Sequence, residues 1–130
     1  MPKVKQISAW VENRPGTLGK VADALGAKKI DIRAFMAAVL DGKGFLRVVV
    51  DRPALARKVF AAQGWATTVD ELVEVTVADR PGELGRVADK LGAVGINIHY
   101  GYLGTSGKRG RVSLFMAVEN PAAALRALRR

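Results

Sequence analysis

Two segments of the chain, ENRPGTL at residues 12–18 and ADRPGEL at residues 78–84, carry residues suited to binding a small zwitterion. In each, a proline and a glycine lead into an apolar pattern of helical period, so the segment forms the start of a helix. A helix N-terminus offers unpaired N–H groups and a partial positive charge, which suit a carboxylate. Gly16 and Gly82 have no Cβ, so a ligand can approach the backbone there.

Four polar residues near these segments can receive a free ammonium group. Asn13, Asp31, Asp79 and Asn97 offer amide or carboxylate oxygens, and we expect them to lie close enough to the helix starts to act with them. A simpler interpretation is that Asn13 and Asp79 cap their helices, and that the glycines serve only the turn. Asp31 and Asn97 begin strands, where both residue types are disfavoured, which favours a binding or strand-end capping role.

The residues that catalysis needs are scarce. The chain has no cysteine, and His99 is its single histidine, so thiol nucleophiles and thiolate metal sites are excluded. Neither GTLGKVADALG nor GELGRVADKLG ends in the GK(S/T) of a phosphate-binding loop. We therefore expect no enzyme, no cofactor and no metal site.

The segment from Val11 to Ile32 aligns without gaps onto the segment from Val77 to Ile98. The shift is constant, since 80 − 14 = 66 at the arginines and 98 − 32 = 66 at the end. A period of this length is the size of a domain, so the chain is a duplicated module. We expect residues 1–70 to form the first module and residues 71–130 the second.

Each copy follows the order β-α-β-β-α, and the first copy can add a fourth strand at residues 66–69. Alternating residues predict first strands that carry Ile7, Ala9 and Val11, or Val73, Val75 and Val77. Helices are expected to begin at four prolines and to bury an apolar face that includes Leu18 or Leu84: Pro15, Pro53, Pro81 and Pro121. The predicted fold class is α+β, with two ferredoxin-like βαββαβ modules. The second module, whose last helix runs to Arg130, lacks its last strand and should leave an open sheet edge.

The repeated pattern of strand, (N/D)RPGxL, helix and (G/K)I(N/D)I resembles the ACT domain family, over nearly the whole chain. ENRPGTL followed by IDI is especially similar to the regulatory domain of phosphoglycerate dehydrogenase. The resemblance implies a tandem, stand-alone protein that binds a free amino acid between the first-strand-to-helix loop of one module and a neighbouring module. The ligand-binding residues it implies are Asn13, Arg14, Pro15, Gly16, Thr17, Leu18, Asp31 and Ile32 in the first copy, and Asp79, Arg80, Pro81, Gly82, Glu83, Leu84, Asn97 and Ile98 in the second.

The first site is the better candidate, because Glu83 stands where the first copy has Thr17 and its negative charge would repel a carboxylate. Serine is the first ligand that the resemblance suggests. The same resemblance implies regulation rather than catalysis, with a separate metabolic enzyme as one candidate partner. We expect a homo-oligomer, because the open sheet face and the missing last strand both leave surface to cover.

The net charge of +9 keeps an alternative function open, because basic proteins often bind nucleic acid. RNA-binding modules of βαββαβ order stack bases on sheet aromatics, for which Trp10, Phe45 and Phe115 are the candidates. The cations are spread along the chain, however, and these side chains can instead bury against the other module or a second chain. We therefore expect this sheet face to be an oligomer interface, with RNA binding as the second interpretation. With no apolar run long enough to span a membrane, we expect a cytoplasmic protein.

Overall fold

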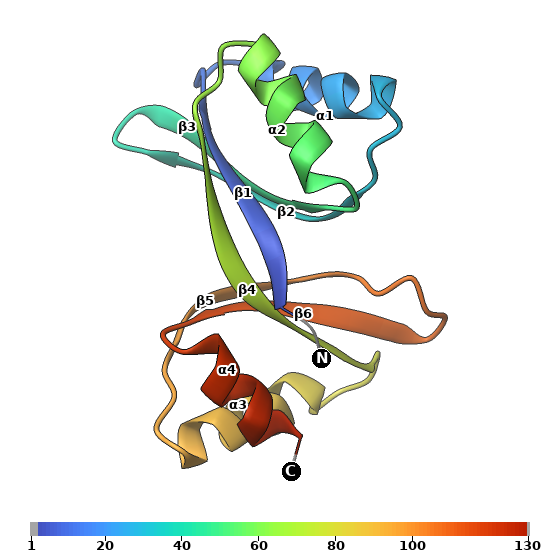
Figure 1. Cartoon of the computed structure of the whole chain (residues 1–130), viewed down its shortest axis with the longest axis vertical. Coiled ribbons are helices and arrows are strands. Elements are labelled where there is room, and N and C mark those ends of the chain that lie inside the picture. The colour runs from blue at the N-terminus through green and yellow to red at the C-terminus, as the bar shows by residue number, and fades with distance from the viewer. Residues whose placement is uncertain (1–2, 130) are drawn as a thin grey trace. The chain divides into compact units, whose positions relative to one another are not determined.

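The computed structural model describes residues 3–129 (Figure 1). The chain divides into two compact units, with the boundary between Asp70 and Glu71. The first module is Lys5–Asp70; the second begins at Glu71 and also includes the first residues of the chain, of which Lys3 and Val4 are described. The elements are β1 (Lys3–Val11), α1 (Thr17–Ala27), β2 (Ile32–Leu40), β3 (Lys43–Val50), α2 (Pro53–Ala62), β4 (Thr67–Ala78), α3 (Glu83–Ala93), β5 (Ile98–Thr105), β6 (Arg111–Val118) and α4 (Pro121–Leu128).

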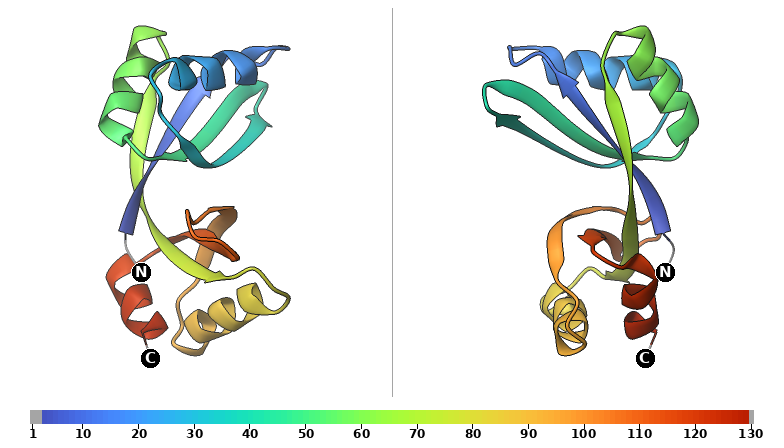
Figure 2. Two further views of the ribbon diagram at one scale, coloured as in Figure 1. Left: turned by 90° about the vertical axis from the view of Figure 1, so that its right-hand side faces the viewer. Right: turned by 60° about the vertical axis from the view of Figure 1, so that its left-hand side comes forward.

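The first module is the expected ferredoxin-like unit. Its strands lie in the order β2-β3-β1-β4, and β3 runs antiparallel to both β1 and β2. Helices α1 and α2 cover one face of this sheet (Figure 1), as the two turned views in Figure 2 also show. The core between helices and sheet is aliphatic and aromatic, as this α+β architecture requires: Ile7, Val21, Leu25, Ile30, Leu46, Val48, Val50, Ala56, Val59, Phe60 and Trp65.

The second module repeats this arrangement, with β6 antiparallel to β4 and β5 and with α3 and α4 packed on one face. The strand expected at residues 66–69 and the next module's first strand are one continuous 12-residue strand, β4. The absent fourth strand does not leave β4 open. The start of β1 belongs to this unit and lies beside β4, where an ion pair joins Lys3 Nζ to Glu71 Oε1 at 3.9 Å. Lys3 and Val4, expected in the first module at residues 1–70, therefore group with the second.

Two further expectations are corrected. Pro15 and Pro81 do not open helices, because α1 and α3 begin at Thr17 and Glu83, whereas Pro53 and Pro121 do begin α2 and α4. Leu18 and Leu84, expected on the buried helix face, are 47% and 60% exposed. They lie in the first helical turn, where each lines a cavity beside the sheet. The last helix ends at Leu128, and Arg130 lies outside the described residues.

The first strand of each module is covered on both faces in its centre. Residues 6–9 of β1 and 72–75 of β4 are buried without a break, so the predicted alternation of buried and exposed residues fails there. Glu74 alternates with Val73 and Val75, so a half-buried strand would turn it to solvent; it is instead buried and accepts a hydrogen bond from the hydroxyl of Ser113. A buried carboxylate needs such partners to offset its desolvation.

Candidate functional site

The loop between β1 and α1 has its shape fixed by Gly16. This residue is the N-cap of α1 and adopts φ 90°, a left-handed conformation that side chains with a Cβ resist. No side chain caps the helix, so the first-turn N–H groups are not satisfied by a capping residue. A Cβ at Gly16 would meet no atom within 4 Å, which means that backbone conformation, rather than crowding, requires glycine here.

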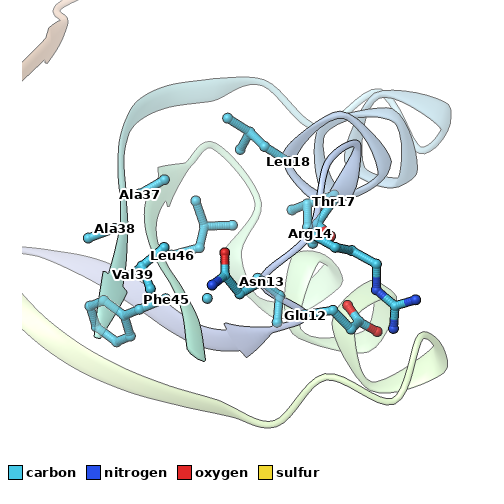
Figure 3. Close-up of a pocket in the computed structure, with 13 residues that line it drawn as sticks. Glu12, Asn13, Arg14, Thr17, Leu18, Ala37, Ala38, Val39, Phe45 and Leu46 are labelled. Atoms are coloured by element: carbon cyan, nitrogen blue, oxygen red, sulfur yellow. The ribbon is translucent and has the colours of Figure 1, made fainter. Parts of the chain in front are cut away.

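Asn13 does not cap α1, which was the simpler interpretation of its position in the sequence. Its Nδ2 donates to the carbonyl oxygen of Gly42, at 3.3 Å, in the turn between β2 and β3. Figure 3 shows the amide pointing into the space between α1 and the β2–β3 hairpin. The hydrogen bond therefore ties the loop to the hairpin and fixes which way the amide oxygen faces.

A cavity of about 250 Å³ opens beside Asn13. Its walls come from the end of β1, the first turn of α1 and the facing halves of β2 and β3: Val11, Glu12, Asn13, Arg14, Thr17, Leu18, Val21, Ala37, Ala38, Val39, Gly44, Phe45 and Leu46. The side chains of Glu12 and Arg14 point away from this space, and Asn13 points into it (Figure 3). The cavity thus has one polar corner, beside the helix start, and largely apolar walls.

A second hollow, of about 290 Å³, lies on the other side of the same loop, and Glu12, Arg14 and Lys20 help to line it. Trp65 Nε1 donates to Glu12 Oε2 at 3.2 Å, and Lys20 Nζ lies 5.9 Å from the centre of a Trp65 ring. A hydrogen bond with its own backbone N–H, followed by the one from Trp65, lowers the pKa of Glu12. The Glu12 carboxylate is therefore held by its hydrogen bond with Trp65.

Asp31 and Ile32 lie at the opposite end of the first module. Asp31 precedes β2, whereas the cavity beside Asn13 is lined by the far half of that strand, at residues 37–39. The backbone N–H of Asp31 donates to Asp51 Oδ1 at 3.0 Å, and the N–H of Asp51 donates to the Asp31 carbonyl at 3.2 Å. Within one module, the structure does not bring Asp31 and Asn13 together as expected.

The second module uses the matching loop differently. Gly82 has φ 91° and begins α3, as Gly16 begins α1. Glu83 is held by Arg86, 3.2 Å from Nη2 to Oε1, and by Arg80, 3.7 Å from Nε to Oε2. The Arg86 hydrogen bond is the main cause that lowers the pKa of Glu83. This carboxylate keeps its charge at the position that Thr17 holds in the first module.

The cavity of the second module, about 230 Å³, has no lining residue from the loop at 79–83. It is lined by Leu84, Ile98, Gly101, Tyr102, Leu103, Leu114 and Met116. The backbone N–H of Asp79 donates to the carbonyl of Gly110, at 3.0 Å, beside the β5–β6 turn. Asn97 precedes β5 and lies at the other end of that strand. The two modules are therefore similar in fold and differ in the residues that line their cavities.

The geometry and the sequence agree with a known family. Residues 2–127 match the family described as an ACT domain pair. The chain belongs to this family. Its fold is similar to that of a protein from Bacteroides thetaiotaomicron, at 26% identity and TM-score 0.87, over 98% of this chain and 87% of that one. It is also similar to the ligand-free regulatory subunit of aspartate kinase from Thermus thermophilus, at 20% identity and TM-score 0.70, over 96% of this chain and 89% of that one. No curated protein matches the chain.

Sequence reasoning missed several residues of this candidate site. Ala37 and Val39 line the cavity, and Gly42 holds Asn13, although they come from a hairpin outside the repeated segment. The small residues Ala37 and Ala38 on an edge strand were the signal in the sequence that could have indicated this cavity. Within residues 3–129, no group of three or more histidine, cysteine or acidic side chains is placed to hold a metal ion. No described helix is long and apolar enough to cross a membrane.

The aromatic platform that RNA binding requires is largely buried. Phe45 and Phe115 are 6% and 0% exposed, and of the three candidate side chains Trp10 alone is exposed. Base stacking needs accessible ring faces. The burial of two of the three rings argues against this alternative.

Proposed function

We propose that this ACT domain pair is a non-catalytic regulatory protein that binds a free amino acid beside Asn13. The observation that carries the proposal is the Asn13 side chain, held by Gly42 at the polar corner of a cavity next to the uncapped start of α1. An α-carboxylate would accept hydrogen bonds from the first-turn N–H groups, aided by the helix dipole. The Asn13 amide oxygen would accept from the α-ammonium group.

The two groups of predicted ligand residues can act together if two copies of the chain associate along β2. This strand is the free edge of the first module and carries the exposed apolar side chains of Phe35, Val39 and Leu40. Leu18, in the first turn of α1, is exposed as well. An edge of this kind favours pairing with another chain. In an antiparallel pairing, Asp31 at the start of one β2 would approach the end of the other, near Asn13 of the second copy. We infer that the complete site forms in such a homo-oligomer.

We infer further that the chain signals to a separate metabolic enzyme. The Thermus thermophilus neighbour is named as a regulatory subunit of aspartate kinase, which supports such a role for the shared fold. A ligand that binds across two copies stabilises the associated state by mass action. Occupancy would therefore be reported as a change in association.

The test is calorimetry of the whole chain against the twenty amino acids, with serine among the first because of the family resemblance. Asn13→Ala is expected to weaken binding of any hit at least tenfold, because the ammonium group loses its acceptor. Its thermal stability should stay close to that of the wild type, since Asn13 is exposed. Asp79→Ala, the matching change in the second module, is the control and should bind normally. Equal affinity for Asn13→Ala and wild type would refute the site.

A further inference from the structure

The inner wall of the Asn13 cavity is built of aliphatic side chains. They come from β1, α1, β2 and β3, and we call them the aliphatic wall: Val11, Leu18, Val21, Ala37, Val39 and Leu46. Val21 and Leu46 are almost fully buried, so this wall is continuous with the core of the module. A ligand that fills the cavity would place its side chain against these groups.

The polar groups of the cavity gather at one end. Asn13 and the start of α1 lie there, whereas the charged side chains of Glu12 and Arg14 point away (Figure 3). Among the lining residues, Thr17 alone carries a hydroxyl group, and it belongs to the first turn of α1. A zwitterion held at the polar end would therefore have no polar partner along the aliphatic wall. Burying a ligand hydroxyl without a hydrogen bond is unfavourable.

The volume leaves room for an extended side chain. The cleft is open to solvent, and its volume of about 250 Å³ can receive a branched or unbranched aliphatic group beside the aliphatic wall. Leucine, isoleucine and methionine carry such groups, whereas glycine and serine would leave part of the wall unfilled. Each additional buried methylene group strengthens binding by about fourfold.

We propose that this cleft selects a free amino acid with an aliphatic side chain of about three or four carbons, in preference to serine, and binds one per chain. The inference rests on the proposed function and names the ligand class of that site. Filling the wall favours leucine over serine, and the unsatisfied serine hydroxyl adds to the difference. Binding occurs once per chain because the second module keeps its Glu83 carboxylate at the matching loop.

The second copy provides the substitution that tests this inference. Leu103 pairs with Leu114 on β6 as Ala37 pairs with Leu46 on β3, so the two residues hold matching positions. A leucine at the first position would occupy space that Ala37 leaves open in the cavity. Ala37→Leu therefore fills the cleft with a side chain that the fold already accepts at the matching place.

The experiment is calorimetry of the full chain with L-leucine, L-isoleucine, L-methionine, L-valine and L-serine. We expect at least one of the aliphatic amino acids to bind ten or more times as tightly as serine, with a stoichiometry of one per chain. Ala37→Leu should weaken that binding at least tenfold. Met36→Leu is the matched control, because Met36 precedes Ala37 on β2 and does not line the cavity; it should bind as the wild type does.

The possible failures are distinguishable. Serine binding as tightly as the aliphatic amino acids, or tighter, would overturn the aliphatic selectivity and leave the proposed function standing. Undiminished binding by Ala37→Leu would show that the side chain of the bound amino acid does not lie beside Ala37. No heat with any of the twenty amino acids would overturn the proposed function and the inference together. A circular dichroism melt of each variant separates loss of binding from loss of folding.

Discussion

The indole nitrogen of Trp65 donates a hydrogen bond to the carboxylate of Glu12, at 3.2 Å, across 53 positions of sequence. Trp65 follows α2, and Glu12 opens the loop that carries Asn13. The contact fastens the loop that carries Asn13 to the segment between α2 and β4, where Trp65 also packs against the core. A loop held at both Glu12 and Asn13 is preorganised for a ligand, which lowers the entropic cost of binding.

This contact makes the stability of the first module depend on pH. The pKa of Glu12 is lowered in the folded protein, so its contribution is present at neutral pH and is lost as the pH falls through that lowered value, below about 4.5. Urea unfolding at pH 7 and pH 3 should therefore show a smaller loss on acidification for Glu12→Gln than for the wild type. Trp65→Phe removes the donor and should reduce the loss in the same direction. An identical acid response in all three proteins would contradict the assignment.

Gly16 should tolerate substitution poorly although space surrounds it. Its φ of 90° is strained for any residue with a Cβ, so Gly16→Ala is expected to lower the free energy of unfolding by about 1–2 kcal/mol. Gly19→Ala, inside α1 and also without crowding, should raise it by about 0.5–1 kcal/mol through helix propensity. Chemical denaturation of both variants measures the difference. Equal effects of the two alanines would contradict the conformational argument.

The β2 edge should govern association of the chain. Phe35 is 54% exposed on this edge, and Phe35→Lys places a charge where a second copy would pack. Sedimentation equilibrium should show the variant as a monomer at concentrations where the wild type associates. Leu103→Lys, on the edge strand of the second module, is the control and should associate as the wild type does. Loss of association in the Leu103 variant alone would assign the interface to β5 instead.

Arg52 should stabilise the end of α1. Its Nη2 donates to the carbonyls of Lys28 and Lys29, at 2.9 Å and 2.6 Å, where the helix leaves carbonyl groups without partners. Arg52→Ala is expected to cost about 1 kcal/mol in unfolding free energy. Arg57→Ala, an exposed arginine on α2, is the comparison and should have a smaller effect. Thermal unfolding at low and high salt measures both.

Local pattern was enough to predict the fold. The constant shift between the two RPG segments revealed the duplication, and apolar periodicity placed four helices and the order of the strands. These features are carried by neighbouring residues, because helix and strand periods are properties of short stretches of chain. The same stretches predicted a turn at Gly16 and Gly82, but they placed the helix starts at Pro15 and Pro81, two residues too early.

The tertiary structure decided which residues are neighbours in space. Asn13 and Asp31 flank the same helix in sequence, yet α1 carries the chain to the other end of the sheet, so the two residues are separated within the module. The polar corner of the cavity needed the hairpin turn at Gly42, and its aliphatic wall needed Ala37 and Leu46 to meet α1. Sequence spacing does not predict such contacts, because they depend on strand direction and register across the whole sheet.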